Sequence, residues 1–485
     1  MIFSSITFLF LFLPLVLGIY FVLPGIRARN LLLMVASFLF YAWGEKAFAL
    51  VMVLSITVNY FLGIGLERCR NEKSEKGLLI LSVFFNLGLL AVFKYTNFIV
   101  DNLNIVLIYF KFQLITIPKI HLPAGISFFT FHSLSYIIDI YRSTSLAQKS
   151  FEKLTLYISF FPQLIAGPII RYHDVEGQLS KRPITSDDLV EGIRRFILGL
   201  GKKVLIANTL AEVVDKIFAI PSENLTLGLA WLGIVGYTLQ IYFDFSGYSD
   251  MAIGLARMFG FHFLENFNYP YISQSIRDFW RRWHISLSNW LRDYLYIPLG
   301  GNRCSPLRNY FNLITVFFLC GLWHGASWNF IIWGLFHGAF LILERLPMMR
   351  WLDSAWSPIR HVYAVLVIMI GWVFFRTTDL NSASTFLKAM VGQAQGNGAN
   401  YNVLMYLNLE VALVILVGIC ASAPIFPQIL KLQSSTVLAQ SSKWMSRMLA
   451  FLFLVVGGAY FSFIFVASAA RIASGTYNPF IYFRF

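Results

Sequence analysis

The sequence predicts an all-α, polytopic integral membrane protein, and three observations support this fold class. Of the 485 residues, 58% are hydrophobic and only 13% are charged, whereas a soluble domain carries about 25% charged residues. Apolar runs long enough to cross a hydrocarbon core recur along the whole chain. Several runs contain Pro or Gly, as at Pro162, Gly167 and Pro168, and membrane segments tolerate such breaks only where protein or a cavity satisfies the freed backbone groups.

Hydropathy predicts about eleven membrane-spanning helices, accompanied by re-entrant or interfacial helices. The two longest apolar segments can each hold more than one membrane element. The segments lie near residues 2–23, 30–44, 47–66, 77–93, 96–116, 124–141, 153–170, 226–261, 310–343, 360–375, 408–426 and 447–470.

Basic residues predict the orientation of the chain in the membrane. The formal net charge is +14, and basic clusters at Arg27 with Arg29 and at residues 67–76 follow the first and third apolar segments. The positive-inside rule places both clusters in the cytoplasm and the N-terminus outside. No positively charged region precedes residues 2–23, which favours a retained helix over a cleaved signal peptide. No nucleic-acid motif accompanies the basic excess, so we expect no nucleic-acid partner.

The polar segment 171–203 predicts an amphipathic helix on the cytoplasmic membrane surface. A helix-start pattern begins at Thr185, and apolar side chains recur at helical spacing from Leu189 to Ile197. A surface anchor is the simple interpretation. A direct role in gating or in docking of an acyl donor is the alternative.

Missing motifs narrow the possible chemistry. The four cysteines lack CxxC spacing, so neither a disulfide framework nor a thiolate zinc site is predicted, and we expect no metal. The chain has no HExxH, no GxSxG, no P-loop and no His-x4-Asp motif, which removes the corresponding zinc-protease, α/β-hydrolase, nucleotide-binding and glycerolipid acyltransferase readings. Histidine chemistry within a membrane remains.

Three stretches carry more polar residues than a lipid-facing helix tolerates. The first contains Asp244, Ser246 and Asp250 at the end of an apolar run. The two carboxylates are six residues apart, almost on opposite faces of a helix, so they do not predict an acid-base pair. Polar packing with hydrogen bonds to neighbouring arginines is the expected role.

The second stretch, residues 277–293, predicts one amphipathic helix at an interface or at the mouth of a cavity. Arg277, Arg281, His284 and Arg292 share one face of this helix, and aromatic and apolar side chains share another. His284 is a candidate functional histidine. A solvated interfacial histidine is the alternative.

The third stretch surrounds His324, inside the apolar segment 310–343. A histidine at membrane depth needs a partner or a cavity and can act as a general base, while Gly321 and Gly325 leave room for a substrate. A hydrogen-bonded histidine that joins helices is the alternative. On a straight helix His337 does not pair with His324. The remaining histidines are expected to be structural: His121, His132, His173, His262 and His361.

Five motifs concentrate in the second half of the chain. They are YFDFSGYSD at 242–250, ENFNYPYISQSI at 265–276, WRRWHISL at 280–287, WLRDYLYIPLGGNR at 290–303 and GLWHGA at 321–326. These motifs closely resemble the membrane-bound O-acyltransferase family, in particular its bacterial branch. Further likeness extends over essentially the whole chain, through MIFSS at the N-terminus, LPAGISFFTFHSLSYIIDIYR at 122–142, LIAGPIIR at 164–171 and NPFIYFRF at 478–485.

The resemblance implies the identity of the functional residues and the architecture. By position, His324 matches the catalytic histidine of the family, and His284 matches the second functional histidine of this branch. A ring of transmembrane helices would surround a central tunnel that donor and acceptor enter from opposite sides. Residues 1–485 would form a single transmembrane domain, with a catalytic core at about 120–345 and C-terminal helices at 358–470.

The same resemblance implies the reaction. Neutral His324 would take the proton of an acceptor hydroxyl, whose oxygen attacks an acyl thioester. Acetyl-CoA on the cytoplasmic side is the expected donor substrate, with no bound cofactor, and hydroxyls of an extracytoplasmic polysaccharide such as alginate are the expected acceptor. Side chains expected to contact substrate or support the tunnel are Trp323, Arg281, Arg282, Trp283, Asp244, Ser246 and Asp250.

The expected setting is the bacterial inner membrane, where the chain contacts membrane lipid. Expected partners are periplasmic acetyltransferases and a polysaccharide synthesis and export complex. Two alternatives stay open. One is D-alanyl transfer from a carrier protein to a cell-envelope polymer, and the other is a conduit for an acyl group or a lipid-linked sugar that performs no chemistry.

Overall fold

The computed structural model describes residues 1–349, 351–393, 396, 398, 400–425, 443–475 and 477–479. These residues form helices and contain no strand, in agreement with the predicted all-α class. Residues 480–485 of the C-terminal motif and residues 426–442 of the expected C-terminal helices lie outside the described part.

The helices of the first half of the chain are η1 (Phe8–Phe12), α1 (Leu13–Val22), α2 (Gly25–Glu45), η2 (Lys46–Phe48), α3 (Ala49–Arg68), α4 (Glu72–Tyr109), α5 (Ile126–Tyr141), α6 (Phe151–Ser159), α7 (Phe161–Leu164), α8 (Tyr172–Ser180), α9 (Ser186–Gly201), η3 (Lys202–Ala207), α10 (Asn208–Phe218) and η4 (Ser222–Asn224). Those of the second half are α11 (Leu227–Met258), η5 (Pro270–Ile272), α12 (Ile276–Arg282), α13 (Ile285–Leu291), η6 (Arg292–Tyr296), α14 (Pro306–His324), α15 (Trp328–Leu343), η7 (Pro347–Met349), α16 (Trp351–Ser354), α17 (Ser357–Arg376), α18 (Leu380–Met390), η8 (Val403–Met405), α19 (Leu409–Ala421) and α21 (Lys443–Ala473).

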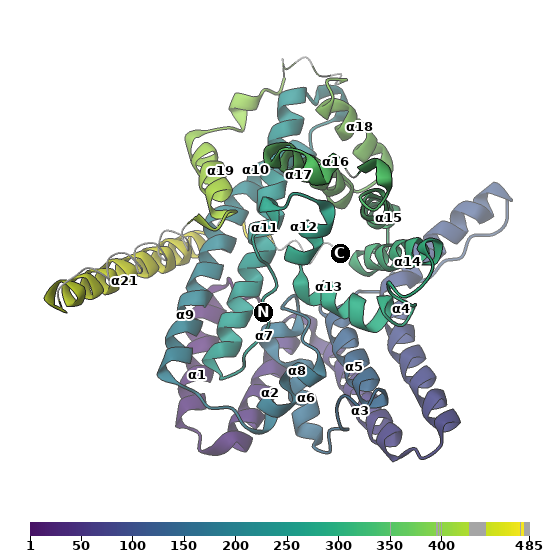
Figure 1. The fold of residues 1–485 in the computed structure, drawn as a ribbon, viewed down its shortest axis with the longest axis vertical. Coiled ribbons are helices and arrows are strands. Elements are labelled where there is room, and N and C mark those ends of the chain that lie inside the picture. Colours follow the sequence, from purple (N-terminus) through teal and green to yellow (C-terminus); the bar gives the residue numbers. More distant parts are fainter. Residues whose placement is uncertain are drawn as a thin grey trace.

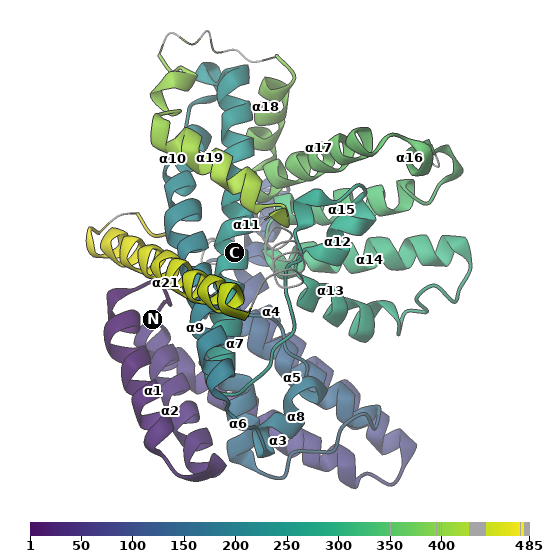
Figure 2. The same cartoon turned by 60° about the vertical axis from the view of Figure 1, so that its left-hand side comes forward.

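Two groups of helices cross one another. Figure 2 shows α14, α15 and α17 side by side, lying crosswise to α10 and α11. The short helices α12 and α13 lie near the centre of the view between the surrounding helices (Figure 1).

The apolar segments 77–93 and 96–116 contribute to one helix, α4, which continues through Lys94. The sequence-based division at Lys94 is therefore wrong. Hydropathy falls at a cation whether or not the cation has partners, but Lys94 is buried and donates hydrogen bonds within the protein. A polar side chain that is satisfied in this way does not need to end a helix.

The predicted surface helix at 171–203 begins as expected but is placed differently. The Thr185 side chain caps the start of α9 by accepting from the backbone N–H of Asp188 at 3.0 Å. The helix then continues through η3 into α10 and packs along α11. A Cβ on Gly199 would lie only 2.5 Å from the carbonyl oxygen of Gly247, so the two backbones approach closely. Small residues at this interface make α9 part of the helix bundle. Its position at the cytoplasmic membrane surface stays a prediction.

Within the described residues, 4 helical segments are long and apolar enough to cross a membrane. In one of them, α4, only 17% of the most apolar window is buried in the protein, so its remaining apolar surface is available to lipid. Three shorter apolar helices accompany the 4 segments. The count of about eleven spans and the ring arrangement stay predictions. The long segments are Gly25–Arg68, Glu72–Tyr109, Ser357–Arg376 and Leu454–Ala473, and the shorter ones are Phe8–Val22, Trp328–Leu343 and Leu409–Ala421.

Candidate functional site

His324 is the last residue of α14, at the closed end of a hairpin formed by α14 and α15. The hairpin is tight because a Cβ on Gly321 would overlap the backbone of Phe330, and the ring of Phe330 occupies the Cβ position of Gly325. The glycines therefore allow the two helices to pack closely. The prediction that they leave room for a substrate is wrong, and so is the straight helix assumed between His324 and His337.

A cavity of about 380 Å³ reaches His324. His324 is only 7% exposed, and its Nδ1 is buried without a hydrogen-bond partner. Buried polar atoms are nearly always paired, so an unpaired nitrogen on a ring that lines a cavity marks a candidate functional group. Polar side chains that line the cavity are Glu45, Lys94, His121, Ser127 and His324, and apolar ones include Phe128, Ile165 and Trp323.

Two neighbouring residues of α4 fix the end of α14. The last four carbonyl groups of an α-helix have no partner within the helix, and here all four are satisfied. The Tyr95 hydroxyl donates to the Leu322 carbonyl at 2.9 Å. Lys94 Nζ donates to the carbonyls of Trp323 and, at 3.4 Å, of His324. The fourth carbonyl accepts from the backbone at the helix end. The turn that carries His324 is thus held in one position by α4.

His284 stands at a sharp break between α12 and α13. Its backbone adopts the left-handed conformation, with φ 44° and ψ 55°, which costs free energy for a residue other than glycine. The break turns the side chain into the protein, where the residue is 1% exposed. The prediction of one continuous amphipathic helix over 277–293 is therefore wrong, and the alternative of a solvated interfacial histidine is wrong as well.

Asn266 fixes the tautomer of His284. Asn266 Oδ1 accepts from the backbone N–H of Ser286 at 3.2 Å, and because a backbone N–H can only donate, this atom must be the amide oxygen. The same oxygen lies 3.1 Å from His284 Nδ1, so Nδ1 carries the hydrogen. His284 Nε2 is buried without a partner and, in the neutral ring, holds the free lone pair.

Trp323 packs near both candidate histidines. Its ring centroid is 4.9 Å from that of His324 and 6.2 Å from that of His284. The indole stacks on Phe131 at 5.4 Å, and Phe131 stacks on Trp290 at 3.9 Å. The structure therefore brings His324, His284 and Trp323 together. The stacked rings of Phe131 and Trp290 support Trp323.

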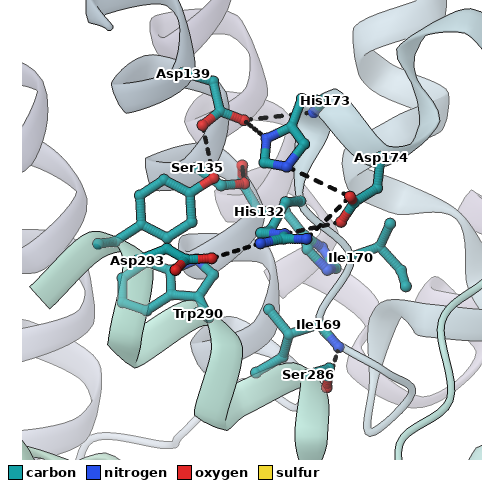
Figure 3. Close-up of polar contacts among 12 residues, drawn as sticks. His132, Ser135, Asp139, Ile169, Ile170, His173, Asp174, Ser286, Trp290 and Asp293 are labelled. Carbon is teal, nitrogen blue, oxygen red and sulfur yellow. Dashed lines mark hydrogen bonds and ion pairs between the residues drawn. The ribbon is translucent and has the colours of Figure 1, made fainter. Parts of the chain in front are cut away.

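Ion pairs and hydrogen bonds anchor the segment after His284 to neighbouring helices (Figure 3). Arg171 Nη1 lies 2.6 Å from Asp293 Oδ2. The Tyr294 hydroxyl donates to Asp139 at 2.6 Å, and Asp139 also lies 2.8 Å from His173 Nδ1. These contacts tie η6 to α5 and α8, so His173 serves the structure, as predicted.

Three residues predicted to support the tunnel lie on α11 and do not line the cavity at His324: Asp244, Ser246 and Asp250. The two carboxylates face α9 and η3. Asp244 Oδ1 is 2.5 Å from Lys203 Nζ. Asp250 lies 2.9 Å from Arg195 Nη2 and 2.6 Å from Lys202 Nζ. Polar packing against basic side chains is confirmed for both carboxylates.

The other three predicted residues are also outside the cavity at His324. Arg281 lines a second cavity, of about 310 Å³, between α12 and the end of α15. Arg282 is held by Asp278 at 3.0 Å. The Trp283 ring packs 4.9 Å from that of Trp372, in an aromatic cluster.

Some features of the site are not among those predicted from the sequence: Lys94, Asn266, and the pair of His121 with Glu45, whose side chains are 3.2 Å apart at the cavity. A lone cation inside a long apolar segment is a signal that could have identified Lys94. Asn266 lies within the motif at 265–276, but no local pattern shows that it meets His284. Nothing in the sequence shows that His121, which we expected to be structural, meets Glu45.

The arrangement suits proton transfer in an enclosed site. The His324 ring adjoins a cavity and carries a nitrogen that no protein group occupies, which is what a general base needs. In the described part of the chain, no group of three or more His, Cys, Asp or Glu side chains is placed to hold a metal ion.

Comparison with known proteins gives a family model and full-length relatives. The model of the membrane-bound O-acyltransferase family matches residues 125–381. A protein of Azotobacter vinelandii named as a probable alginate O-acetylase is 42% identical, over 100% of both chains. A peptidoglycan O-acetyltransferase of Helicobacter pylori is 36% identical, over 100% of this chain and 98% of that protein. A teichoic acid D-alanyltransferase of Bacillus subtilis is 32% identical, over 52% of this chain and 66% of that protein.

Proposed function

The chain belongs to the membrane-bound O-acyltransferase family, and we propose that it moves an acetyl group from a cytoplasmic thioester towards hydroxyls of an extracytoplasmic polysaccharide such as alginate. Family membership makes the protein an O-acyltransferase. The observation that carries the rest of the proposal is the buried ring of His324, held rigidly at the edge of a cavity with an unpartnered nitrogen.

His324 is proposed as the general base. Its neutral ring takes the proton from the acceptor hydroxyl while the hydroxyl oxygen attacks the thioester carbonyl carbon. The tetrahedral intermediate collapses to form the ester bond and break the carbon-sulfur bond, and the proton moves from the imidazolium to the departing thiolate. No proton or electron is gained or lost overall. The buried aromatic surroundings exclude water that would otherwise hydrolyse the thioester.

His284 is proposed as the second functional residue. Its Nε2 is free to accept a hydrogen bond because Asn266 holds the proton on Nδ1. An acceptor hydroxyl bound to His284 Nε2 would be oriented beside Trp323 for attack. Trp323 is proposed to shape this part of the site.

Acetyl-CoA is the proposed donor, and alginate is the proposed acceptor because relatives at 42% identity over the full length are named for that polymer. A peptidoglycan acceptor is the second candidate, since a relative named for it is 36% identical over the full length. D-alanyl transfer is less well supported because the relative named for it matches only 52% of this chain.

We place the protein in the bacterial inner membrane with its N-terminus outside. Arg27, Arg29 and the charged cluster at 67–76 support this orientation through the positive-inside rule. Residues 1–485 are proposed to form one domain, with a core at about 120–345 that overlaps the family match at 125–381. Periplasmic acetyltransferases and a polysaccharide synthesis and export complex are the proposed partners.

Complementation of a deletion strain tests the proposal. Ester-linked acetyl is measured on the secreted polysaccharide of cells that carry wild type, His324→Ala or the control His262→Ala, after the membrane level of each protein is equalised. His262 is an exposed histidine outside the cavity. Wild type and the control should restore acetylation, whereas His324→Ala should not. Full acetylation by His324→Ala would reject the proposed base and favour a conduit.

A further inference from the structure

A cavity of about 250 Å³ lies beside the cavity at His324 and has no assigned role. We call it the Tyr41 cavity. The two cavities share Glu45, Ala124 and Ile165 as lining residues, so they adjoin at the end of α2. Together they have a volume typical of sites for small molecules, about 300–1,000 Å³. The other residues that line the Tyr41 cavity are Met1, Ile2, Ser5, Thr7, Tyr41, Trp43 and Gly44.

The place where the two cavities adjoin is extracytoplasmic in the orientation proposed above. α2 has 21 residues and is therefore about 31 Å long, close to the thickness of a hydrocarbon core of about 30 Å. Arg27 and Arg29 at its start mark the cytoplasmic surface, so Glu45 at its end lies near the opposite surface. The Tyr41 cavity is therefore on the side of the membrane where the proposed acceptor polymer lies.

The C-terminal segment holds the wall of the Tyr41 cavity that residues 1–7 form. Asn478 Nδ2 donates to the Ser4 carbonyl at 2.9 Å, and Asn478 Oδ1 accepts from Asn208 Nδ2 at 3.0 Å. The MIFSS segment is thus tied to the C-terminal motif and to α10. Because these contacts fix the wall before a ligand binds, binding costs less free energy for ordering the site.

The polar groups at the Tyr41 cavity suit sugar hydroxyls. The Glu45 side chain is 15% exposed, and its carboxylate lies 3.2 Å from His121 Nε2. Within the described residues, this is the one hydrogen bond to the Glu45 carboxylate. A carboxylate offers about four acceptor positions, so most of them stay open to donor hydroxyls. The Tyr41 hydroxyl is buried without a hydrogen-bond partner, a state in which polar atoms are rarely left.

Trp43 adds an apolar surface to the same cavity. It lines the cavity although the residue is 66% exposed. A sugar ring carries C–H groups on its faces and hydroxyls at its edge, so it needs an apolar surface beside hydrogen-bonding groups. The large flat face of an indole provides such a surface. An exposed tryptophan near a membrane surface also serves as a lipid anchor, but an anchor would have no effect on sugar binding.

The charges at the two cavities disfavour an anionic group next to Glu45. The Lys94 ammonium is engaged with Ser127 and with the carbonyls at the end of α14, and His121 faces Glu45. A second negative charge beside the Glu45 carboxylate would be repelled. The expected ligand therefore presents hydroxyl groups to Glu45. A uronate would keep its own carboxylate on the far side of the sugar ring.

We propose that the Tyr41 cavity binds one sugar residue of the acceptor polymer while the neighbouring residue of the same polymer lies beside His324. This inference rests on the proposed function. Glu45 accepts hydrogen bonds from the sugar hydroxyls, and Trp43 packs against the ring of the bound sugar. Binding of the second residue supplies free energy that holds the reacting hydroxyl in place. The enzyme therefore selects a polymer over a single sugar.

Binding of oligosaccharides tests the site without any chemistry. Purified full-length protein in lipid nanodiscs is titrated with a mannuronate tetrasaccharide and, in a second arm, with a peptidoglycan disaccharide. Wild type should bind at least one of them, and Trp43→Ala should bind that oligosaccharide about tenfold more weakly. Glu45→Gln should weaken the same binding. The control Trp356→Ala changes an exposed tryptophan that lines neither cavity and should bind like wild type. Binding of neither oligosaccharide by wild type, or equal binding by wild type and Trp43→Ala, overturns the proposal.

Turnover separates the Tyr41 cavity from the reacting site. Acetyl transfer is measured to the oligosaccharide that binds and to its single sugar. Trp43→Ala should raise KM for the oligosaccharide about tenfold and change KM for the single sugar little. Equal losses with both acceptors would show a structural role and overturn the assignment. If His324→Ala keeps full transfer while Trp43→Ala loses oligosaccharide affinity, the proposed base fails and the sugar site stands.

Discussion

Two groups of buried polar side chains differ in whether their polar atoms have partners. Where α11 meets α9 and η3, Asp244 pairs with Lys203 and Asp250 pairs with Arg195 and a lysine. Around His324, several ring nitrogens are buried without partners. An unsatisfied buried polar group costs about 1–3 kcal/mol. The paired charges therefore stabilise the packing of α11 against α9 and η3, and the unpaired nitrogens mark the place where a substrate is expected to bind.

Breaking the paired group should have the largest effect on stability. Asp244→Leu leaves the Lys203 ammonium buried beside an apolar side chain, which should destabilise the protein by about 3–5 kcal/mol. Thermal unfolding of the purified protein in detergent measures the loss. The double variant Asp244→Leu with Lys203→Met should recover much of it, because no charge remains buried. A Tm equal to wild type for Asp244→Leu would show that the pair does not support the fold.

Removing the hydrogen bonds from Lys94 to the end of α14 should affect turnover more than donor affinity. Lys94→Met leaves the carbonyls of Trp323 and His324 without a charged donor, at about 1–3 kcal/mol for each unsatisfied group. We expect kcat to fall about 10- to 100-fold because His324 loses its fixed position, while KM for the donor changes little. Steady-state kinetics of the variant and of the exposed control Lys216→Met measure both constants. An increase in KM at unchanged kcat would contradict a positioning role.

Removing the acceptor that keeps the His284 proton on Nδ1 should have a smaller effect on acetyl transfer. Asn266→Leu removes the acceptor of the Nδ1 proton, so the free lone pair is no longer fixed on Nε2. We expect transfer to fall about tenfold, as is typical when a group that orients a functional histidine is lost. Ser249→Ala, which removes only the hydroxyl that accepts from the Asn266 amide, should cost less. A larger loss of transfer in Ser249→Ala than in Asn266→Leu would show that the contact of Asn266 with His284 is not the one that matters for transfer.

An exposed ion pair should contribute little. Lys76 and Glu72 lie one turn apart at the start of α4, and the hydrogen bond from Lys76 lowers the pKa of the Glu72 carboxyl. A carboxyl whose pKa is lower in the folded state stabilises that state when the pH is above the pKa of the unfolded state. Any such contribution is lost as the pH falls through the pKa of the folded state. Exposed pairs contribute little in salt. Glu72→Gln should therefore leave both Tm and acetyl transfer unchanged at neutral pH, as a parallel unfolding curve and rate assay would show.

The fold class could be predicted from composition because burial in lipid requires apolar helices whatever their arrangement. The helix boundaries could not be predicted, because hydropathy does not show whether a polar side chain has hydrogen-bond partners within the protein. Lys94 looks like the end of a span, although α4 continues through it. Residues 310–343 form α14 and α15, which agrees with the expectation that this long segment holds more than one element, but hydropathy does not show where the turn between them lies.

The candidate site could be predicted in part. The motifs identify His324 and His284, and the structure places both beside Trp323. The break at His284 could not be predicted, because the left-handed backbone is held by Asn266, which lies on another segment. Asp244 and Asp250 show the opposite case: their polarity indicates function in the sequence, but their partners on α9 and η3 assign them to the fold.

His324 is proposed as the base for acetyl transfer. The most direct measurement is the initial rate of transfer from acetyl-CoA to an alginate oligosaccharide by purified protein in vesicles, for wild type and for His324→Gln, which keeps a polar side chain of similar size. We expect a rate at least about 100-fold lower for His324→Gln, with an unchanged Tm. A variant that transfers acetyl at the wild-type rate would contradict it.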